Sequence, residues 1–144
     1  MSLSESLNAA GIGRTLLCDV TCPQLSEIEH CRTRIVYGTD FLRCALNSAL
    51  SPHTRLRCAF ESAYLCCCEV AEASGLSFER VEHPSMVIVN AAAMMLDLTG
   101  ADNVTLRTLI EWASSNSPFL PQLKPEDARV LATDMVVRTI QYFA

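Results

Sequence analysis

The sequence predicts an all-α fold, a mostly antiparallel bundle of four to five helices. Apolar residues recur every three or four positions over residues 52–74 and 125–143, the spacing of a helix with one buried face. The two runs with strand propensity, residues 35–37 and 86–89, both lie inside helical periodicity, so no strand pattern competes. Because the predicted helices are joined by short links, neighbouring helices are expected to run antiparallel.

Length and composition predict one domain. The chain has 144 residues, and we expect an irregular N-terminal segment over residues 1–22 followed by a single helical bundle domain over residues 23–144. Half of the residues are hydrophobic (50%) and only 19% are charged, which leaves apolar surface that favours an oligomer interface. The net charge of −5 argues against binding nucleic acid through clustered basic residues. It does not decide the question, because a local basic patch can form from Arg32, Arg34, Arg43, Arg55 and Arg57, all in the first half of the chain.

The sequence also predicts a cytoplasmic protein that does not enter a membrane. No apolar run reaches the roughly 18 residues that a membrane span needs. The longest candidate, Met86–Leu98, contains Asn90 and Asp97. No basic leader precedes an apolar stretch near Met1, so a signal peptide is not expected. The eight cysteines are therefore interpreted as reduced, small, apolar core residues.

The first two helices are predicted over residues 23–50 and 52–74. Gly38 interrupts the first and costs about 1 kcal/mol relative to alanine, so the helix can break there. Ser51 is a good N-cap for the second helix, Pro52 suits its first position and Gly75 provides a stop. The buried stripe predicted for the second helix is Leu56, Phe60, Ala63, Cys67, Val70 and Ser74.

Three further helices complete the predicted bundle. The third, residues 84–98, has an unusually broad apolar surface, which favours a central position. The fourth is short, residues 104–114, with Asn103 as its expected cap. A loop with two prolines follows. The last helix covers residues 125–143 and begins with proline and two acidic residues, which suit the positive end of the helix dipole.

The cysteines and histidines predict no metal site. Cys18 and Cys22 have the spacing of one zinc-binding pair, but His30 and Cys31 are adjacent in sequence and would point about 100° apart on a helix. The run Cys66–Cys68 cannot share one helix face, and a structural role in the core is the stronger interpretation. We therefore predict no metal and no cofactor.

Arg80 and His83 lie just before the third predicted helix. An arginine and a histidine near a helix N-terminus can hold a phosphate group. The simpler interpretation is a connector in which His83 caps the helix or faces solvent. Both residues belong to the candidate binding surface.

Two segments resemble HEPN-type helical domains. Residues 50–64, LSPHTRLRCAFESAY, are similar to the second helix of those domains. The sequence SNSPF at residues 115–119, followed by LKPEDA at residues 123–128, is similar to the stretch before their last helix. The resemblance covers roughly residues 24–143 and implies a four- or five-helix bundle that forms a dimer.

The resemblance also implies that the usual HEPN chemistry is missing. In active members an arginine and a histidine a few positions apart cleave RNA across the dimer. Here Ser115 stands at the arginine position, Asn116 matches the asparagine that follows it, and Phe119 or Leu120 falls near the histidine position. These replacements neither transfer a proton nor carry positive charge. We therefore expect that the chain is not an enzyme. If it does catalyse a reaction, the resemblance implies a ribonuclease.

The leading hypothesis is a non-catalytic interaction module that forms a homodimer and binds a protein partner. The resemblance implies partners of the nucleotidyltransferase or toxin–antitoxin type. One alternative is an RNA-binding or RNA-cleaving domain with a rearranged site, built from Arg80 and His83 or from Arg55 and His53. Another is a small-ligand pocket between helices. The predicted binding surface consists of Trp112, Ser115, Asn116, Phe119, Arg80 and His83. For Trp112, a core position beneath the loop is the stronger interpretation.

Overall fold

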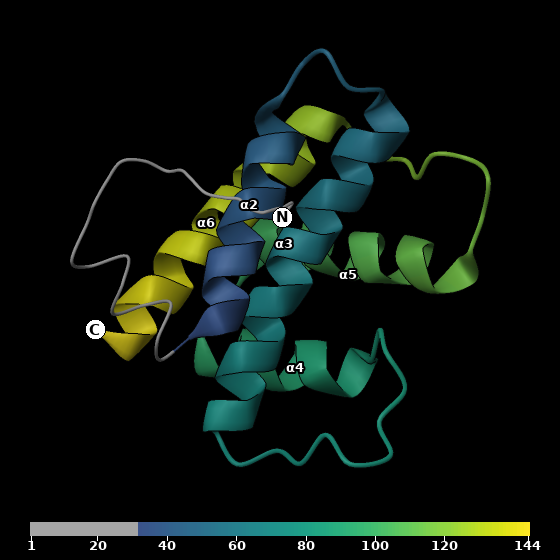
Figure 1. Ribbon diagram of the computed structural model, residues 1–144. Coiled ribbons are helices and arrows are strands. Elements are labelled where there is room, and N and C mark those ends of the chain that lie inside the picture. Colours follow the sequence, from purple (N-terminus) through teal and green to yellow (C-terminus); the bar gives the residue numbers. More distant parts are fainter. Residues whose placement is uncertain (1–31) are drawn as a thin grey trace. The chain divides into compact units, whose positions relative to one another are not determined.

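The computed structural model describes residues 32–144, and within that range every regular element is an α-helix. The all-α prediction is therefore confirmed (Figure 1). The helices are α2 (Thr33–Leu46), α3 (Pro52–Ala73), α4 (Met86–Met95), α5 (Gly100–Ser115) and α6 (Pro125–Phe143). Predictions for the first 31 residues lie outside the described residues. They concern the irregular segment, the start of the first helix and the zinc spacing of Cys18, Cys22, His30 and Cys31.

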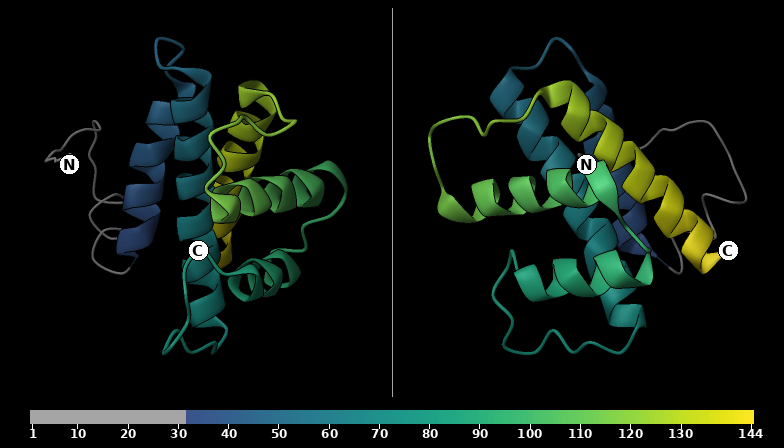
Figure 2. Two further views of the ribbon diagram at one scale, coloured as in Figure 1. Left: turned by 90° about the vertical axis from the view of Figure 1, so that its right-hand side faces the viewer. Right: turned by 180° about the vertical axis from the view of Figure 1, so that it is seen from behind.

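The chain divides into two compact units, Met1–Val36 and Tyr37–Ala144, with the boundary inside α2. The second unit is built around α3, which packs against α4, α5 and α6. Figure 2 shows α4 and α5 running across α3, whereas α6 runs along it. The prediction that the third helix is the central one is wrong, because among the helices of residues 32–144 α4 packs against α3 and α5 alone, whereas α3 packs against three helices. No helix among the described residues has the length and hydropathy needed to cross a membrane.

The central helix α3 begins and ends where its local signals predict. The Ser51 hydroxyl accepts a hydrogen bond from the Thr54 backbone N–H (3.2 Å), and proline occupies the first turn. At the other end Gly75 has φ 106° and the Leu76 N–H donates to the Ala71 carbonyl (3.1 Å). This pattern is a Schellman cap, which satisfies carbonyls that the helix would leave free. The predicted stripe is buried except for Ser74, which is exposed.

Helix α2 continues through Gly38 without a break. A Cβ atom at this position would lie 3.3 Å from the Ser62 carbonyl oxygen, so glycine allows α2 to approach α3 closely. The helix ends at Leu46 and does not reach the predicted residue 50. The side-chain oxygen of Asn47 accepts the Ala49 N–H (3.0 Å), and this local turn competes with further helix.

Helices α4 and α5 have different bounds from those predicted. Helix α4 ends in a Schellman cap in which Asp97 adopts a left-handed conformation (φ 55°) and the Leu98 N–H donates to the Ala93 carbonyl (2.9 Å). Gly100, with φ 59°, then turns the chain directly into α5. Helix α5 therefore begins four positions before the predicted residue 104, and the expected cap Asn103 lies inside its first turns.

Candidate functional site

The end of α5 holds four of the predicted binding residues together. Trp112 is buried, with 8% of its surface exposed, and its indole N–H donates to the Phe119 carbonyl (2.8 Å). The His53 ring from the first turn of α3 meets the indole edge-on, with ring centroids 5.2 Å apart. Trp112 therefore supports the loop from beneath, between two helices, and does not present its ring to solvent.

Ser115 and Asn116 form the turn at which α5 ends. The Ser115 hydroxyl donates to the Trp112 carbonyl (2.8 Å). Asn116 adopts a left-handed conformation (φ 53°), which asparagine tolerates better than most residues. Both residues are exposed. They give the polar edge of the surface that the loop presents.

Phe119 and Leu120 are the apolar part of this surface. The Phe119 side chain is 76% exposed and that of Leu120 is 51% exposed. The Phe119 backbone is nevertheless fixed, because its N–H donates to the Ser117 hydroxyl (3.1 Å) and its carbonyl accepts the Trp112 indole. The loop therefore holds two large apolar side chains in solvent on a tethered backbone. We call residues 116–121 the Phe119 loop.

Arg80 and His83 lie in a second place, the connector between α3 and α4. The hydroxyl of Tyr64, a buried residue of α3, lies 2.6 Å from His83 Nδ1 and accepts the Ser85 N–H (2.8 Å). The Tyr64 hydroxyl therefore links the His83 ring to the backbone just before α4. Burial raises the pKa of Tyr64, against the lowering effect of the Ser85 N–H. Arg80 is exposed, with φ 65°.

The six predicted residues therefore form two separate groups. Each group contacts α3 at a different residue. His53 of α3 contacts Trp112, and Tyr64 of α3 contacts His83, and these two α3 residues are about three helical turns apart. At 1.5 Å per residue this separation is about 16 Å along the axis. The structure thus does not unite Arg80 and His83 with the Phe119 loop in one site.

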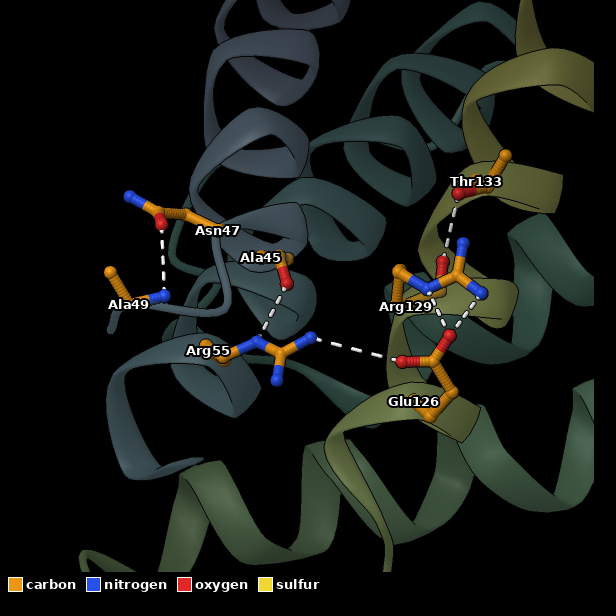
Figure 3. Close-up of polar contacts among 7 residues, drawn as sticks. All are labelled: Ala45, Asn47, Ala49, Arg55, Glu126, Arg129 and Thr133. Carbon is orange, nitrogen blue, oxygen red and sulfur yellow. Dashed lines mark hydrogen bonds and ion pairs between the residues drawn. The ribbon is translucent and has the colours of Figure 1, made fainter. Parts of the chain in front are cut away.

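Arg55, the cation of one rearranged nuclease site, is already engaged (Figure 3). Its Nε donates to the Ala45 carbonyl at the end of α2 (3.1 Å). Its Nη2 lies 3.8 Å from Glu126 Oε1 on α6. Glu126 also pairs with Arg129, and both cations hold the pKa of that carboxyl below its usual range. Arg55 thus joins three helices, whereas His53 contacts the Trp112 ring.

Two polar contacts within the Tyr37–Ala144 unit were not predicted from the sequence. One is Tyr64 with His83, and the other is a contact between the thiols of Cys44 and Cys58. No spacing motif joins either pair, so only the packing of the helices brings them together. Within residues 32–144, no group of three or more His, Cys, Asp or Glu side chains is placed to hold a metal ion.

Comparisons of the chain with known protein families, with curated proteins and with solved structures find no match. The resemblance to HEPN-type domains therefore stays a prediction from the residues that carry it. The fold defines an all-α bundle, and the geometry at the end of α5 defines an exposed apolar loop that the bundle holds in place.

Proposed function

We propose that this chain is a non-catalytic, HEPN-like interaction module that uses the Phe119 loop to bind a protein partner. The observation that carries the proposal is the 76% exposure of Phe119 on a loop tied down by the Trp112 indole. Solvent-exposed aromatic side chains on an ordered backbone are typical anchors of protein interfaces.

The energetics favour an apolar pocket as the complement of this loop. Burying a side chain such as phenylalanine or leucine contributes about 1.5–3 kcal/mol. Ordering a free loop would oppose binding, but the Phe119 backbone is held at its N–H and at its carbonyl before any partner arrives. The polar residues Ser115 and Asn116 lie at the edge, as in the rim of a protein interface.

The same positions argue against catalysis. Ser115, Phe119 and Leu120 supply neither a general base nor a positive charge at neutral pH, so they do not stabilise a pentavalent phosphate. The net charge of −5 likewise disfavours an RNA backbone as the partner. A protein surface with an apolar pocket is the ligand class that these residues fit.

A second exposed apolar surface supports the homodimer part of the proposal. Val130, Val137 and Ile140 of α6 are 45%, 48% and 38% exposed. Residues spaced by seven and then three positions share one helix face, so these side chains form a stripe. A self-complementary contact of α6 with α6 of a second copy would bury this stripe.

Two substitutions separate the partner surface from the dimer surface. Tagged wild-type chain, Phe119→Ser and Val137→Ser are compared by pull-down from the native lysate and by sedimentation at several concentrations. Phe119→Ser is expected to weaken the capture of a stoichiometric protein about tenfold or more and to leave the mass unchanged. Val137→Ser is expected to shift a dimer toward monomer. Met94→Ser on α4 is the control, because Met94 is 77% exposed and so matches Phe119.

The outcomes distinguish the parts of the proposal. Equal capture by wild type and Phe119→Ser, with both chains folded by circular dichroism, would remove the Phe119 loop as the binding surface. Loss of capture in Met94→Ser as well would point to general surface hydrophobicity. Trp112→Phe keeps an aromatic ring but removes the indole N–H that donates to the Phe119 carbonyl. Capture by this variant is expected to lie between that of wild type and that of Phe119→Ser. The size of its loss measures how much the hydrogen bond contributes to binding.

A further inference from the structure

Two thiols meet across the pair of helices α2 and α3. Cys44 lies in the last turn of α2 and is exposed, and Cys58 lies in the second turn of α3 and is half-buried. The two side chains are close enough for each thiol to shift the pKa of the other. They are separate from Cys66–Cys68, which are buried in the core.

The backbone around both cysteines is held by independent contacts. Gly38 permits close approach of the two helices, since a Cβ there would lie 3.3 Å from the Ser62 carbonyl. Arg55 Nε donates to the carbonyl of Ala45, the neighbour of Cys44, and Arg55 precedes Cys58 by about one turn of α3 (Figure 3). The two cysteines therefore belong to a fixed helix–helix contact.

The local charges give the two thiols different roles. The hydrogen bond from Cys58 lowers the pKa of Cys44 to about 6, against burial and the Asp40 carboxylate and with help from Arg43. The pKa of Cys58 is raised, first by its hydrogen bond to Cys44, then by burial, the Cys44 charge and Glu61. The lowered pKa and the exposure of Cys44 favour it over Cys58 as the thiol that reacts first.

The ion pairs around the thiols complete this local balance of charge. Arg43 pairs with Asp40 on α2 (2.7 Å), and Glu61 pairs with Arg57 on α3 (3.1 Å). Each cysteine therefore has one acidic and one basic neighbour on its own helix. The hydrogen bond between the thiols is then the main difference between Cys44 and an ordinary exposed cysteine.

We infer that Cys44 and Cys58 form a peroxide-sensitive dithiol, in which Cys44 is the attacking thiolate and Cys58 the resolving thiol. The inference rests on the close approach of α2 and α3 at Gly38 and at the Arg55–Ala45 hydrogen bond, which brings the exposed Cys44 next to the half-buried Cys58. It is independent of the Phe119 loop and of the proposed function.

The reaction takes two balanced steps with hydrogen peroxide as oxidant. The Cys44 sulfur attacks one peroxide oxygen, an S–O bond forms, the O–O bond breaks, and hydroxide leaves and is protonated to water. The Cys58 sulfur then attacks the Cys44 sulfenic sulfur, forming the S–S bond, while the hydroxyl group leaves as water with the Cys58 proton. Two thiols and one peroxide give one disulfide and two waters, and a dithiol reductant reverses the change.

Peptide mapping after oxidation tests the inference on the full chain. Replacing Cys18, Cys22 and Cys31 with serine removes the cysteines outside the described residues. The folded chain is treated with hydrogen peroxide, and its free thiols are alkylated after denaturation. Trypsin cleaves after Arg43 and Arg57, among other sites, so that Cys44 and Cys58 fall in different peptides, and chymotrypsin cleavage after Phe60 and Tyr64 separates Cys58 from Cys66–Cys68.

A disulfide-linked pair of peptides that contain Cys44 and Cys58 is expected. It should be lost with dithiothreitol and absent in Cys44→Ser and Cys58→Ser. Two results would overturn the inference. One is Cys44 oxidised to sulfinic acid while Cys58 remains alkylatable, and the other is a main link that joins Cys44 to Cys66, Cys67 or Cys68.

The pH dependence of Cys44 alkylation gives a second test that needs no oxidant. The midpoint in the wild type is expected near pH 6. In Cys58→Ala it should rise by about 2 units, toward the ordinary cysteine value near 8.5. Cys68→Ala is the control, because it removes a thiol about 15 Å further along α3 and should leave the midpoint unchanged. A midpoint that does not move in Cys58→Ala would show that Cys58 does not activate Cys44.

Discussion

Helix α3 contributes cysteines to two sets of thiols, which differ in solvent exposure and in pKa. Near its start Cys58 contacts the exposed Cys44, whose pKa is lowered to about 6. Further along, Cys66 and Cys67 are fully buried. Burial raises the pKa of Cys66 to about 12 and that of Cys67 well above its ordinary value. The first set holds a thiolate at neutral pH, and the second consists of apolar core atoms.

The difference teaches that thiol chemistry follows solvent access and hydrogen bonding, not clustering in the sequence. Three consecutive cysteines, Cys66–Cys68, are the most conspicuous feature of the sequence, and the prediction that they are core residues is confirmed by their burial. Cys44 and Cys58 belong to no motif, and the prediction that the cysteines are core residues is wrong for them, because Cys44 is exposed and Cys58 is only half-buried. They acquire contrasting pKa values only because two helices bring them into contact.

The largest expected effect is on alkylation rates. At pH 7.5 in the folded chain, Cys44 should react with iodoacetamide at least about a thousandfold faster than Cys67, because the buried thiol reacts only after the bundle opens. In guanidinium chloride the ratio should fall to a few-fold. Mass spectrometry of timed samples measures both rates. Fast labelling of Cys67 without denaturant would break the comparison, since it would mean that the core of α3 is open to reagent.

A smaller effect is expected on stability. Cys67→Ser should lower the free energy of unfolding by about 1–2 kcal/mol, because a hydroxyl replaces a buried sulfur and is compensated only in part by a carbonyl one turn back. The matched change Cys58→Ser, on the same helix at a half-buried site, should cost less than about 0.5 kcal/mol. Urea denaturation of the reduced chains measures both. A similar loss of unfolding free energy in the two variants would show that burial does not distinguish the core thiols from Cys58.

The smallest effect concerns Thr139, whose hydroxyl contacts the Cys66 sulfur from α6. Thr139 is fully buried, and its hydroxyl has no oxygen or nitrogen partner among residues 32–144. Because sulfur is a weak partner, Thr139→Val should stabilise the bundle by about 1 kcal/mol. Thermal denaturation under reducing conditions checks this. A loss of stability would show that the hydroxyl–thiol contact is stronger than a packing interaction at the core thiols.

The candidate binding surface could be predicted from the sequence in part. Trp112 was singled out as the lone tryptophan and Phe119 by the resemblance to HEPN-type domains, and the structure joins them by a hydrogen bond. The interpretation of Trp112 as a core residue beneath the loop is confirmed by its burial, whereas the large exposure of Phe119 could not be read from the sequence. Nor did the sequence show that His83 lies apart from Trp112 and Phe119, because the partner of His83 is Tyr64 on α3, 19 residues earlier in the chain. Exposure and pairing depend on how helices pack, which no local pattern records.

The sequence by itself determined that the chain is helical and where several helices begin or end. Ser51 and Gly75 bound α3, and α6 covers the predicted residues, since capping acts through hydrogen bonds within one turn. Tertiary structure alone decided that α3 is central, that glycine fits inside α2 and that Cys44 meets Cys58. These features depend on contacts between residues distant in sequence, which form only when apolar faces are buried against one another.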